Sequence, residues 1–401
     1  MEKLIEEILN LEKPIYVERI EFNKKDGLHI YMNFERGGKF ECPGCKGKRK
    51  VYDTVKKSWK HVKFFQYECY IHFRTPRTGC EECGRLLITP PWAREGSKFT
   101  TLFDENVMKL AKEMPISKIA ELVNEHDTRL WRIINHYTSM AYVKKDFSNI
   151  VRVGCDETSS RKGHNYVTVF ADMKTRDVIY VTQGKNAQTI ERFAEELKHH
   201  NGSADNVTEV AIDMSKAFIN GVNNHLPKAS ITFDKFHVIK ALNEAQDEVR
   251  RMEQKDNPLL KKSRYVWLKN PTNLTKAQKV LLVDLQKKNL KTAKVYQMKL
   301  TFQDIYRTIK DPKEAEIAIK QWLSWAVRSR LEPIKQFAKM VKAHFDGIMH
   351  YFTSRLTTGA MEGINSRIQE IKRRARGFKN IDNFIAMIYL EAANLDFDFP
   401  L

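Results

Sequence analysis

Three acidic residues each follow a strand-like run of the chain, a position at which carboxylates can hold metal ions. Asp156 follows IVRVGC, Asp213 follows VTEVAI, and Asp234 follows SITF. In an α/β sheet, strand ends are where a site assembles. Carboxylates gathered there repel one another unless a cation neutralises them, and oxygen ligands select a hard ion such as Mg²⁺ or Mn²⁺. The pattern predicts a divalent-metal site, although a helix cap or a solvated turn is the commoner place for any single aspartate.

A further carboxylate stands at the head of a basic segment, TTGAMEGINSRIQEIKRRARGF. Glu362 could supply a ligand from a helix that crosses the sheet, while arginines along the same helix hold phosphates. Gly359 and Gly363 would leave room for close backbone approach. The arginines expected to contact DNA here are Arg367, Arg373 and Arg374. An apolar face would pack the helix on the sheet, through Ile364, Ile368, Ile371 and Ala375.

Two C-x-x-C pairs, CPGC and CEEC, predict a structural zinc site. Four thiolates complete a tetrahedron suited to Zn²⁺, and a closed site of this kind is structural. The predicted ligands are Cys42, Cys45, Cys80 and Cys83. Unrelated surface turns are the alternative for the pairs. Cys69 is expected to pack as an apolar residue, and His61 and His72 are also expected to be non-ligands.

The segment MPISKIAELVNEHDTRLWRIINHYTSMA carries two amphipathic helical patterns and predicts a helix-turn-helix. Asp127 or Thr128 would cap the second helix. That helix would present Arg129 and Arg132 to DNA. A plain helical hairpin within a core is the alternative, because the turn lacks the frequent glycine.

The composition favours a polyanionic partner, since the 401 residues carry a formal net charge of +19. Nucleic acid is the first candidate. A membrane surface is the rival, but no apolar run reaches the roughly 18–20 residues that span a bilayer. The N-terminus MEKLIEEILNLEK does not resemble a signal peptide, so we expect a cytoplasmic, nucleoid-associated protein.

The secondary-structure signals change along the chain. Strand-like runs such as LHIYMNF and FFQYECYIHF fall before Trp92, and helical periodicity with a break at Pro115 follows. Strands and helices alternate from Ile150 to about Lys240. Long helical periodicity then runs to about Arg355, where Trp322 and Trp325 share a helix face and are expected to pack in a core rather than stack on bases.

Several of these blocks resemble the DDE transposases of the ISL3 family of bacterial insertion sequences. CDETSSRKGHNYVTVFAD is similar to the first-aspartate block, AIDMSKAFINGV to the second, and GAMEGINSRIQEIKRRARGF to the glutamate block. ITFDKFHVIKALNEAQDEVRR and SRYVWLKNPTNLT also resemble family segments. The paired cysteines and the helix-turn-helix lie where the family has its DNA-binding domains. The resemblance covers nearly the whole chain.

The resemblance implies a multidomain α/β protein with an RNase H-like catalytic core that an α-helical insertion interrupts. It carries the catalytic, metal-binding triad onto Asp156, Asp213 and Glu362, with Asp234 and His237 near the active site. The implied reaction is two-metal phosphoryl transfer: cleavage at the element ends, then attack of the freed 3′-OH on target DNA. Plausible phosphate contacts after the first aspartate are Arg161, Lys162 and His164; a solvated loop is equally compatible with each.

The expected domains are a zinc-binding β domain (1–95), a helix-turn-helix (96–146), the first part of the core (147–243), the helical insertion (244–352) and the C-terminal part of the core (353–401). Double-stranded DNA is the expected partner, as terminal inverted repeats and as target, and the joining of two ends implies a homodimer. The lysine-rich insertion would follow DNA backbones or build that dimer. The alternatives are a metal-dependent DNA junction nuclease and a non-catalytic, domesticated DNA-binding regulator.

Overall fold

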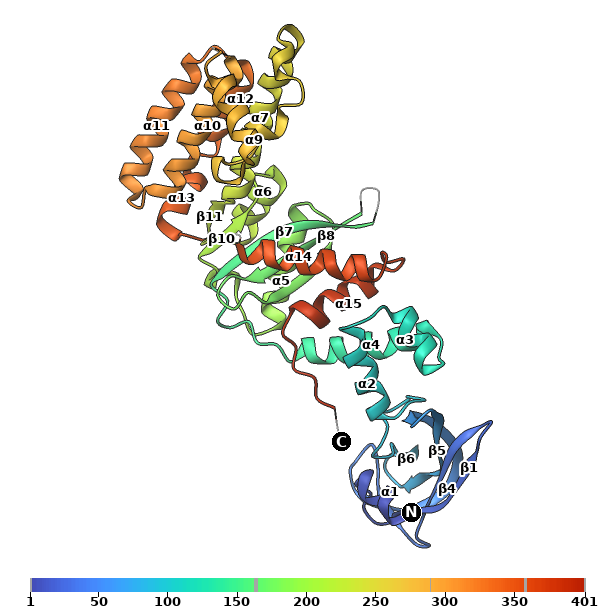
Figure 1. Cartoon of the computed structure of the whole chain (residues 1–401). Coiled ribbons are helices and arrows are strands. Elements are labelled where there is room, and N and C mark those ends of the chain that lie inside the picture. Colours follow the sequence, from blue (N-terminus) through green and yellow to red (C-terminus); the bar gives the residue numbers. More distant parts are fainter. Residues whose placement is uncertain (1, 162–164, 289, 357–358, 400–401) are drawn as a thin grey trace. The chain divides into compact units, whose positions relative to one another are not determined.

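The computed structural model describes residues 2–161, 165–288, 290–356 and 359–399. The chain forms two compact units (Figure 1), one of Met1–Lys144 with Ile371–Leu401 and one of Lys145–Glu370. The boundary between them falls inside helix α14 (Gly359–Arg374). Within the described ranges, no helix combines the length and the apolar character needed to cross a membrane.

A β-sheet forms the N-terminal part of the first unit, after helix α1 (Glu2–Ile8). Its strands run in the order β1-β2-β5-β4-β3, with β6 paired to β5. Their bounds are β1 (Ile15–Asn23), β2 (Gly27–Phe34), β3 (Lys39–Glu41), β4 (Lys48–Phe64), β5 (Tyr67–Cys80) and β6 (Gly84–Leu87). Ile30, Trp59 and Ile71 are buried in its core, so the predicted β-structure is confirmed.

The run FFQYECYIHF is two strands rather than one, which corrects the sequence-based expectation. β4 ends at Phe64 and β5 begins at Tyr67. Between them Phe65 has a φ of 54°, a left-handed conformation that turns the chain. Phe65 is 82% exposed, so the aromatic residues at this point mark a turn and not the continuous strand that their type predicted. Antiparallel pairing of the two long strands brings the cysteine pairs at their far ends together.

Helices make up the rest of the first unit: α2 (Thr101–Ala111), α3 (Ile116–Val123), α4 (Asp127–Val143), α15 (Ile381–Ala392) and the last turn of α14. The break predicted at Pro115 is confirmed, because this proline is the residue before α3. Ile119, Leu130 and Ile134 are fully buried and pack against α15 through Met387. The apolar faces predicted for α3 and α4 therefore form a core.

The second unit contains a mixed sheet in the order β11-β10-β7-β8-β9. Its strands are β7 (Arg152–Arg161), β8 (Asn165–Asp172), β9 (Val178–Gln183), β10 (Glu209–Ile212) and β11 (Ser230–Phe233). β7, β8 and β9 pair antiparallel, whereas β10 pairs parallel with both β7 and β11. Helices α5 (Ala187–His199) and α6 (Lys216–His225) pack together and connect the strands. The predicted α/β class is confirmed.

A helical segment follows the last strand. It comprises α7 (Lys235–Asp256), α8 (Arg264–Leu268), α9 (Lys276–Gln286), α10 (Lys291–Thr308), α11 (Pro312–Arg328), α12 (Glu332–Ala343) and α13 (Phe345–Ser354). Trp322 is buried against Phe302 and Phe337, and its Nε1 donates to the Met298 carbonyl at 2.8 Å. Core packing is therefore confirmed for Trp322, while Trp325 is half-buried.

Helix α13 approaches β11 closely at Gly347. A Cβ atom there would lie 2.5 Å from the Phe233 ring. We expect Gly347→Ala to lower the free energy of unfolding by roughly 1–3 kcal/mol, because the core is overpacked. Gly363→Ala is the control, since a Cβ there meets no described atom within 4 Å. Calorimetry should show a lower Tm for the first variant only; equal Tm values would contradict this packing.

Candidate functional site

The parallel register of the second unit aligns three aspartates. β10 pairs with β7 at Ala211 and Gly154, and with β11 at Ile212 and Phe233. Continuing both registers sets Asp213 level with Asp156 on one side and with Asp234 on the other. Neighbouring strands lie about 4.8 Å apart. The three residues, here called the acid row, therefore lie side by side across β7, β10 and β11, at the carboxyl ends of β10 and β11.

Asp156 lies within a strand and not at its end, which corrects the reading of IVRVGC. β7 continues to Arg161 because β8 pairs with it beyond this point. The parallel pairing with β10 ends earlier, at Gly154. A sequence pattern cannot reveal which partner ends first. Asp213 and Asp234 do follow their strands directly.

The Asp156 carboxylate is held by two hydrogen bonds. Its Oδ1 accepts from the Glu157 amide at 2.8 Å, and its Oδ2 accepts from Asn365 Nδ2 at 2.6 Å. Burial nevertheless raises the pKa of Asp156, and the nearby Asp213 charge adds to that rise. Asp213 Oδ1 accepts from the Ser215 amide at 2.9 Å. The charges in the row therefore influence one another.

His237 is paired with the third member of the row. Its Nδ1 lies 2.9 Å from Asp234 Oδ2, while Asp234 Oδ1 caps α7 by accepting from the Phe236 amide at 2.8 Å. The hydrogen bond with Asp234 raises the pKa of His237, and the charges of Asp156 and Asp213 raise it further. Protonation of the imidazole is therefore favoured beside the acids.

Helix α14 lies against β7 through residues that sequence reasoning missed. Asn365 bonds Asp156, and one turn later Gln369 Nε2 donates to Thr158 Oγ1 at 3.1 Å. At Gly154 a Cβ atom would lie 2.8 Å from Met361 Sδ, so the glycine admits the start of the helix. Spacings of three and seven residues from Glu362 were the available signal, because such residues share a helix face. The close approach expected at Gly363 is absent among the described atoms.

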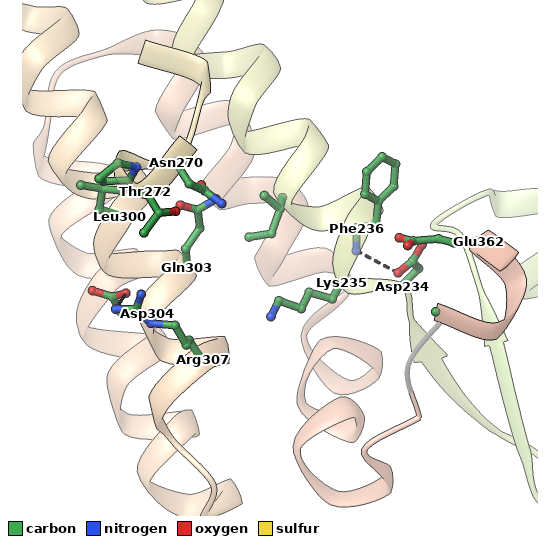
Figure 2. A pocket seen from close by; sticks show the side chains of 13 residues that line it. Asp234, Lys235, Phe236, Asn270, Thr272, Leu300, Gln303, Asp304, Arg307 and Glu362 are labelled. Carbon is green, nitrogen blue, oxygen red and sulfur yellow. Dashed lines mark hydrogen bonds and ion pairs between the residues drawn. The ribbon is translucent and has the colours of Figure 1, made fainter. Parts of the chain in front are cut away.

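Glu362 lines a pocket together with Asp234 (Figure 2). Its side chain is exposed, one helical turn before Asn365. The ligand atoms of Asp156, Asp213 and Glu362 do not all lie within 4.8 Å of one another, because among the described residues only the cysteines form such a group. The hydrogen bond of Asn365 thus places the start of α14, and Glu362 with it, near the acid row. The carboxylates of Asp156, Asp213 and Glu362 do not form a closed cluster.

The residues of the row suit a hard cation. They offer carboxylate oxygens, which Mg²⁺ and Mn²⁺ prefer. Asn365 Oδ1, on the amide that bonds Asp156, is buried and has no hydrogen-bond partner among the described atoms. A buried acceptor without a partner is costly, and a cation or a water that a cation orders would satisfy it.

The predicted phosphate contacts differ in their surroundings. Arg161, Arg367 and Arg373 are exposed. Arg374 is instead half-buried in an ion pair with Glu391. Lys162 and His164 lie outside the described residues.

The four predicted zinc ligands come together in the first unit. The sulfur atoms of Cys42, Cys45, Cys80 and Cys83 all lie within 4.8 Å of one another. A hydrogen bond from Arg49 lowers the pKa of Cys80 to about 6, which favours the thiolate that binds metal. Burial and the neighbouring sulfurs raise the pKa of Cys83 to about 12.

The other cysteine and histidine residues of this domain follow expectation. Cys69 is 1% exposed in the sheet core, and burial raises its pKa to about 12. His61 is half-buried with Nδ1 at 2.8 Å from Thr100 Oγ1, and burial lowers its pKa to about 4. His72 Nδ1 lies 2.7 Å from Ser58 Oγ. None of the three belongs to the four-cysteine group.

The helix-turn-helix has a different cap and turn from those expected. His126 precedes α4, and its Nδ1 accepts from the Thr128 amide at 3.3 Å, so neither Asp127 nor Thr128 is the cap. Asn124 ends α3 with a φ of 50° and takes the place of the glycine that the turn lacks. Asparagine tolerates this conformation because its side chain can bond locally.

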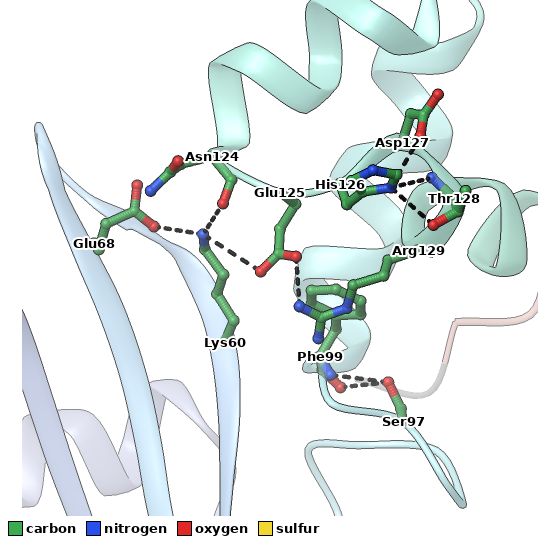
Figure 3. A network of polar contacts seen from close by, with 10 residues as sticks. All are labelled: Lys60, Glu68, Ser97, Phe99, Asn124, Glu125, His126, Asp127, Thr128 and Arg129. Carbon is green, nitrogen blue, oxygen red and sulfur yellow. Dashed lines mark hydrogen bonds and ion pairs between the residues drawn. The ribbon is translucent and has the colours of Figure 1, made fainter.

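A polar network fixes this turn to the zinc-domain sheet (Figure 3). Lys60, only 5% exposed, donates to the Asn124 carbonyl at 2.9 Å and pairs with Glu68 at 2.8 Å and Glu125 at 3.7 Å. Glu125 also binds Arg129 at 2.5 Å. The Arg129 guanidinium stacks 4.4 Å from the Phe99 ring, whereas Arg132 is exposed. Arg129 is thus engaged within the protein.

Comparison with known proteins matches successive parts of the chain. Residues 39–83 match the zinc-finger of transposase IS204/IS1001/IS1096/IS1165, and residues 88–138 match the helix-turn-helix domain of transposase family ISL3. Residues 153–388 match the transposase domain of the same family.

Two curated relatives span nearly the full length. The transposase for insertion sequence element IS1001 of Bordetella parapertussis is 28% identical over 93% of this chain and 94% of its own. The transposase for insertion sequence element IS1557 of Mycobacterium tuberculosis is 25% identical over 98% of this chain and 95% of its own. The transposase domain alone covers more than half of the chain, with the zinc ribbon and the helix-turn-helix ahead of it, so the chain belongs to the ISL3 family of transposases.

Proposed function

We propose that the chain binds the terminal inverted repeats of an insertion sequence, cleaves DNA at the element ends and joins the freed 3′-OH to target DNA. The acid row, with Glu362 lining the pocket beside Asp234, carries this proposal in a chain of the ISL3 transposase family. Phosphoryl transfer depends on positioning and charge neutralisation more than on a protein nucleophile. An RNase H-like core with a helical insertion fits the strand order and the segment α7–α13.

Asp156, Asp213 and Glu362 are the proposed metal ligands. When bound, Mg²⁺ or Mn²⁺ would neutralise charge on the phosphate and lower the pKa of the attacking hydroxyl. The half-buried Asp156 is suited to a cation, because the positive charge of a bound ion would oppose the rise in its pKa. Glu362 is exposed and forms no ion pair with any described residue, so its carboxylate is free to bind.

Asn365 and His237 are proposed to support the acids. Asn365 Nδ2 fixes the orientation of Asp156 Oδ2. Asp234 orients His237 Nδ1, which leaves Nε2 to donate a hydrogen bond to a phosphate oxygen. The raised pKa of His237 keeps this donor charged in more of the molecules at neutral pH.

DNA recognition is proposed for the first unit. Base edges carry the sequence information, and a helix in the major groove can read them. Exposed Arg132 on α4 suits that role, whereas Arg129 acts within the protein, through Glu125 and Phe99. Exposed Arg161, Arg367 and Arg373 suit phosphate contacts. Joining two ends calls for at least a dimer.

Substitution of the proposed ligands tests the catalytic role. Asp156→Asn, Asp213→Asn and Glu362→Gln should each reduce end cleavage by roughly a thousandfold or more, because each removes a charged ligand. Binding of end DNA should persist in a gel-shift assay. Asp172→Asn is the matched control, a buried aspartate that accepts from the Lys174 amide at 2.9 Å outside the row.

Normal cleavage by all three variants would show that the ligand assignment is wrong. The wild-type protein should also join a labelled 3′-OH end to a second DNA in the presence of Mg²⁺. Cleavage without joining would identify a nuclease instead, and binding without either reaction would identify a regulator.

Zinc is proposed as the structural ion of the four-cysteine group. Elemental analysis should find about one zinc per chain, and Cys80→Ser should lose this metal and lower the Tm of the first unit. Cys69→Ser tests specificity, because that buried thiol lies outside the group and the variant should keep its zinc. A wild-type protein free of zinc, or a Cys80→Ser variant that retains it, would refute the assignment.

The pair formed by Asp234 and His237 predicts a pH dependence of stability. Because Asp234 raises the pKa of folded His237, the pair stabilises fully below about pH 6.5, the ordinary histidine value, and this contribution disappears as the pH rises through the folded pKa. His237→Asn should therefore lower Tm more at pH 6 than at pH 9. In an Asp234→Asn background, the difference between the two pH values should shrink, because only the charges of Asp156 and Asp213 then raise the pKa of His237. A pH-independent effect in the otherwise wild-type chain would argue against the pair.

A further inference from the structure

A pocket of about 540 Å³ opens beside the acid row (Figure 2). One wall is formed by Glu362 and by the start of α7, where Asp234, Lys235 and Phe236 lie. The opposite wall is formed by the segment that follows α8 and by α10 of the helical insertion. The proposed catalytic function does not account for this second wall.

Helix α10 turns one face towards the pocket. Leu300, Gln303, Asp304 and Arg307 all line it and follow the spacing of a single helix face. Arg307 is paired with Asp304 at 2.7 Å, so these two charges offset each other. Gln303 lies between this pair and the apolar Leu300. The wall thus offers a neutral polar group next to apolar surface.

Two side-chain amides in the pocket are free to bind a ligand. Asn270 and Gln303 both line it, and neither amide forms a hydrogen bond with any described residue. Each amide presents a donor and an acceptor side by side. This combination is the one that proteins use to read the edge of a nucleobase.

An exposed aromatic ring stands at the same pocket. Phe236 is 56% exposed, although it lies only two residues after the buried Asp234, whose Oδ1 accepts a hydrogen bond from the Phe236 amide. Ile239 and Leu300 add apolar surface to the lining. A ring held in this way can stack on a base of any sequence.

The charges of the lining favour a neutral ring over a phosphate. Asp234, Glu362 and Asp304 are acidic, and only Lys235 and Arg307 are basic. A second anion would be repelled there unless a cation accompanied it. The volume lies within the roughly 300–1,000 Å³ of small-molecule sites, which admits one nucleotide but not a duplex.

We propose that this pocket receives one base of the transposon-end DNA, extruded from the helix next to the phosphate that is cleaved. Phe236 stacks on that base, and Asn270 and Gln303 bond its edge. The inference rests on the proposed transposase function and extends it, because it assigns the helical insertion a part in selecting the cleavage site. Extrusion opens a base pair, and binding in the pocket offsets that loss.

The extrusion step has a direct optical readout. End DNA carrying 2-aminopurine at single positions on either side of the cut should be mixed with the full chain in Ca²⁺, to slow cleavage. We expect a several-fold rise in fluorescence at one position next to the cut and little change elsewhere. The increase in fluorescence should be smaller with Asn270→Ala and Gln303→Ala than with the wild-type chain, because these variants lose contacts to the base edge.

Cleavage kinetics provide a second readout that a purely structural role would not reproduce. Phe236→Ala and Gln303→Ala should slow end cleavage by roughly ten- to a hundredfold on paired DNA. A mismatch at the extruded position should restore much of that rate, because no base pair then has to open. Gln321→Ala on α11 is the matched control, an exposed glutamine that does not line the pocket, and should cleave at the wild-type rate.

The outcomes separate this inference from the proposed function. If the wild-type chain cleaves end DNA but no position brightens, and Phe236→Ala and Gln303→Ala cleave paired DNA normally, the pocket does not hold a base. Slow variants that a mismatch does not rescue would likewise overturn the inference and indicate a structural defect. If the wild-type chain cleaves nothing under any condition, the proposed function itself fails.

Discussion

Like-charge repulsion among the carboxylates of one sheet edge is the constraint on which the second unit depends. Burial raises the pKa of Asp156, and the Asp213 charge adds to the rise. Three kinds of hydrogen bond offset this repulsion. Backbone amides donate to Asp156 and Asp213, the Asn365 side-chain amide donates to Asp156, and the His237 imidazole bonds Asp234. These contacts lessen the repulsion, and His237 is the titratable positive group among them. A bound cation, as proposed above, would neutralise the carboxylates further.

The hydrogen bond from Asn365 to Asp156 links residues 209 positions apart. It sets the rotation of α14 on β7, and Met361 above Gly154 sets how closely the helix approaches. Glu362 shares that face of the helix and reaches the pocket beside Asp234. The opening part of α14 is thus determined by contacts with the sheet, whereas basic residues gather at its other end.

Cations also have internal roles in this basic protein. Lys60 is almost fully buried and ties the turn of the helix-turn-helix to the zinc-domain sheet, and Arg129 is held between Glu125 and Phe99. Both side chains look like DNA contacts when only charge is considered. Their acidic and aromatic partners instead make the turn and the sheet one polar network, so the net charge overstates the surface available to phosphates.

Local patterns in the sequence predicted more than contacts between distant segments. The C-x-x-C pairs, the periodic faces of α3 and α4 and the α/β alternation are local signals, and the structure agrees with them. The face predicted for α14 is only partly right, because Ile371 packs in the core of the first unit and Ala375 lies beyond the helix. The length of β7 depends on which neighbouring strand ends first, so Asp156 was assigned to a strand end. The partners of Asn365 and Arg129 lie on other elements, and no spacing within the chain reveals them. His126 as a cap departs from the usual residue types.

Location of bound Mn²⁺ in a complex of the full chain with end DNA would test the central claim most directly. Anomalous scattering from crystals of that complex identifies the ion and its ligands together. The account predicts Mn²⁺ at the acid row, bound by Asp156 and Asp213, with the Glu362 carboxylate in the same coordination sphere or that of an adjacent ion. Mn²⁺ bound elsewhere, with DNA in place and Glu362 turned away from the row, would contradict it.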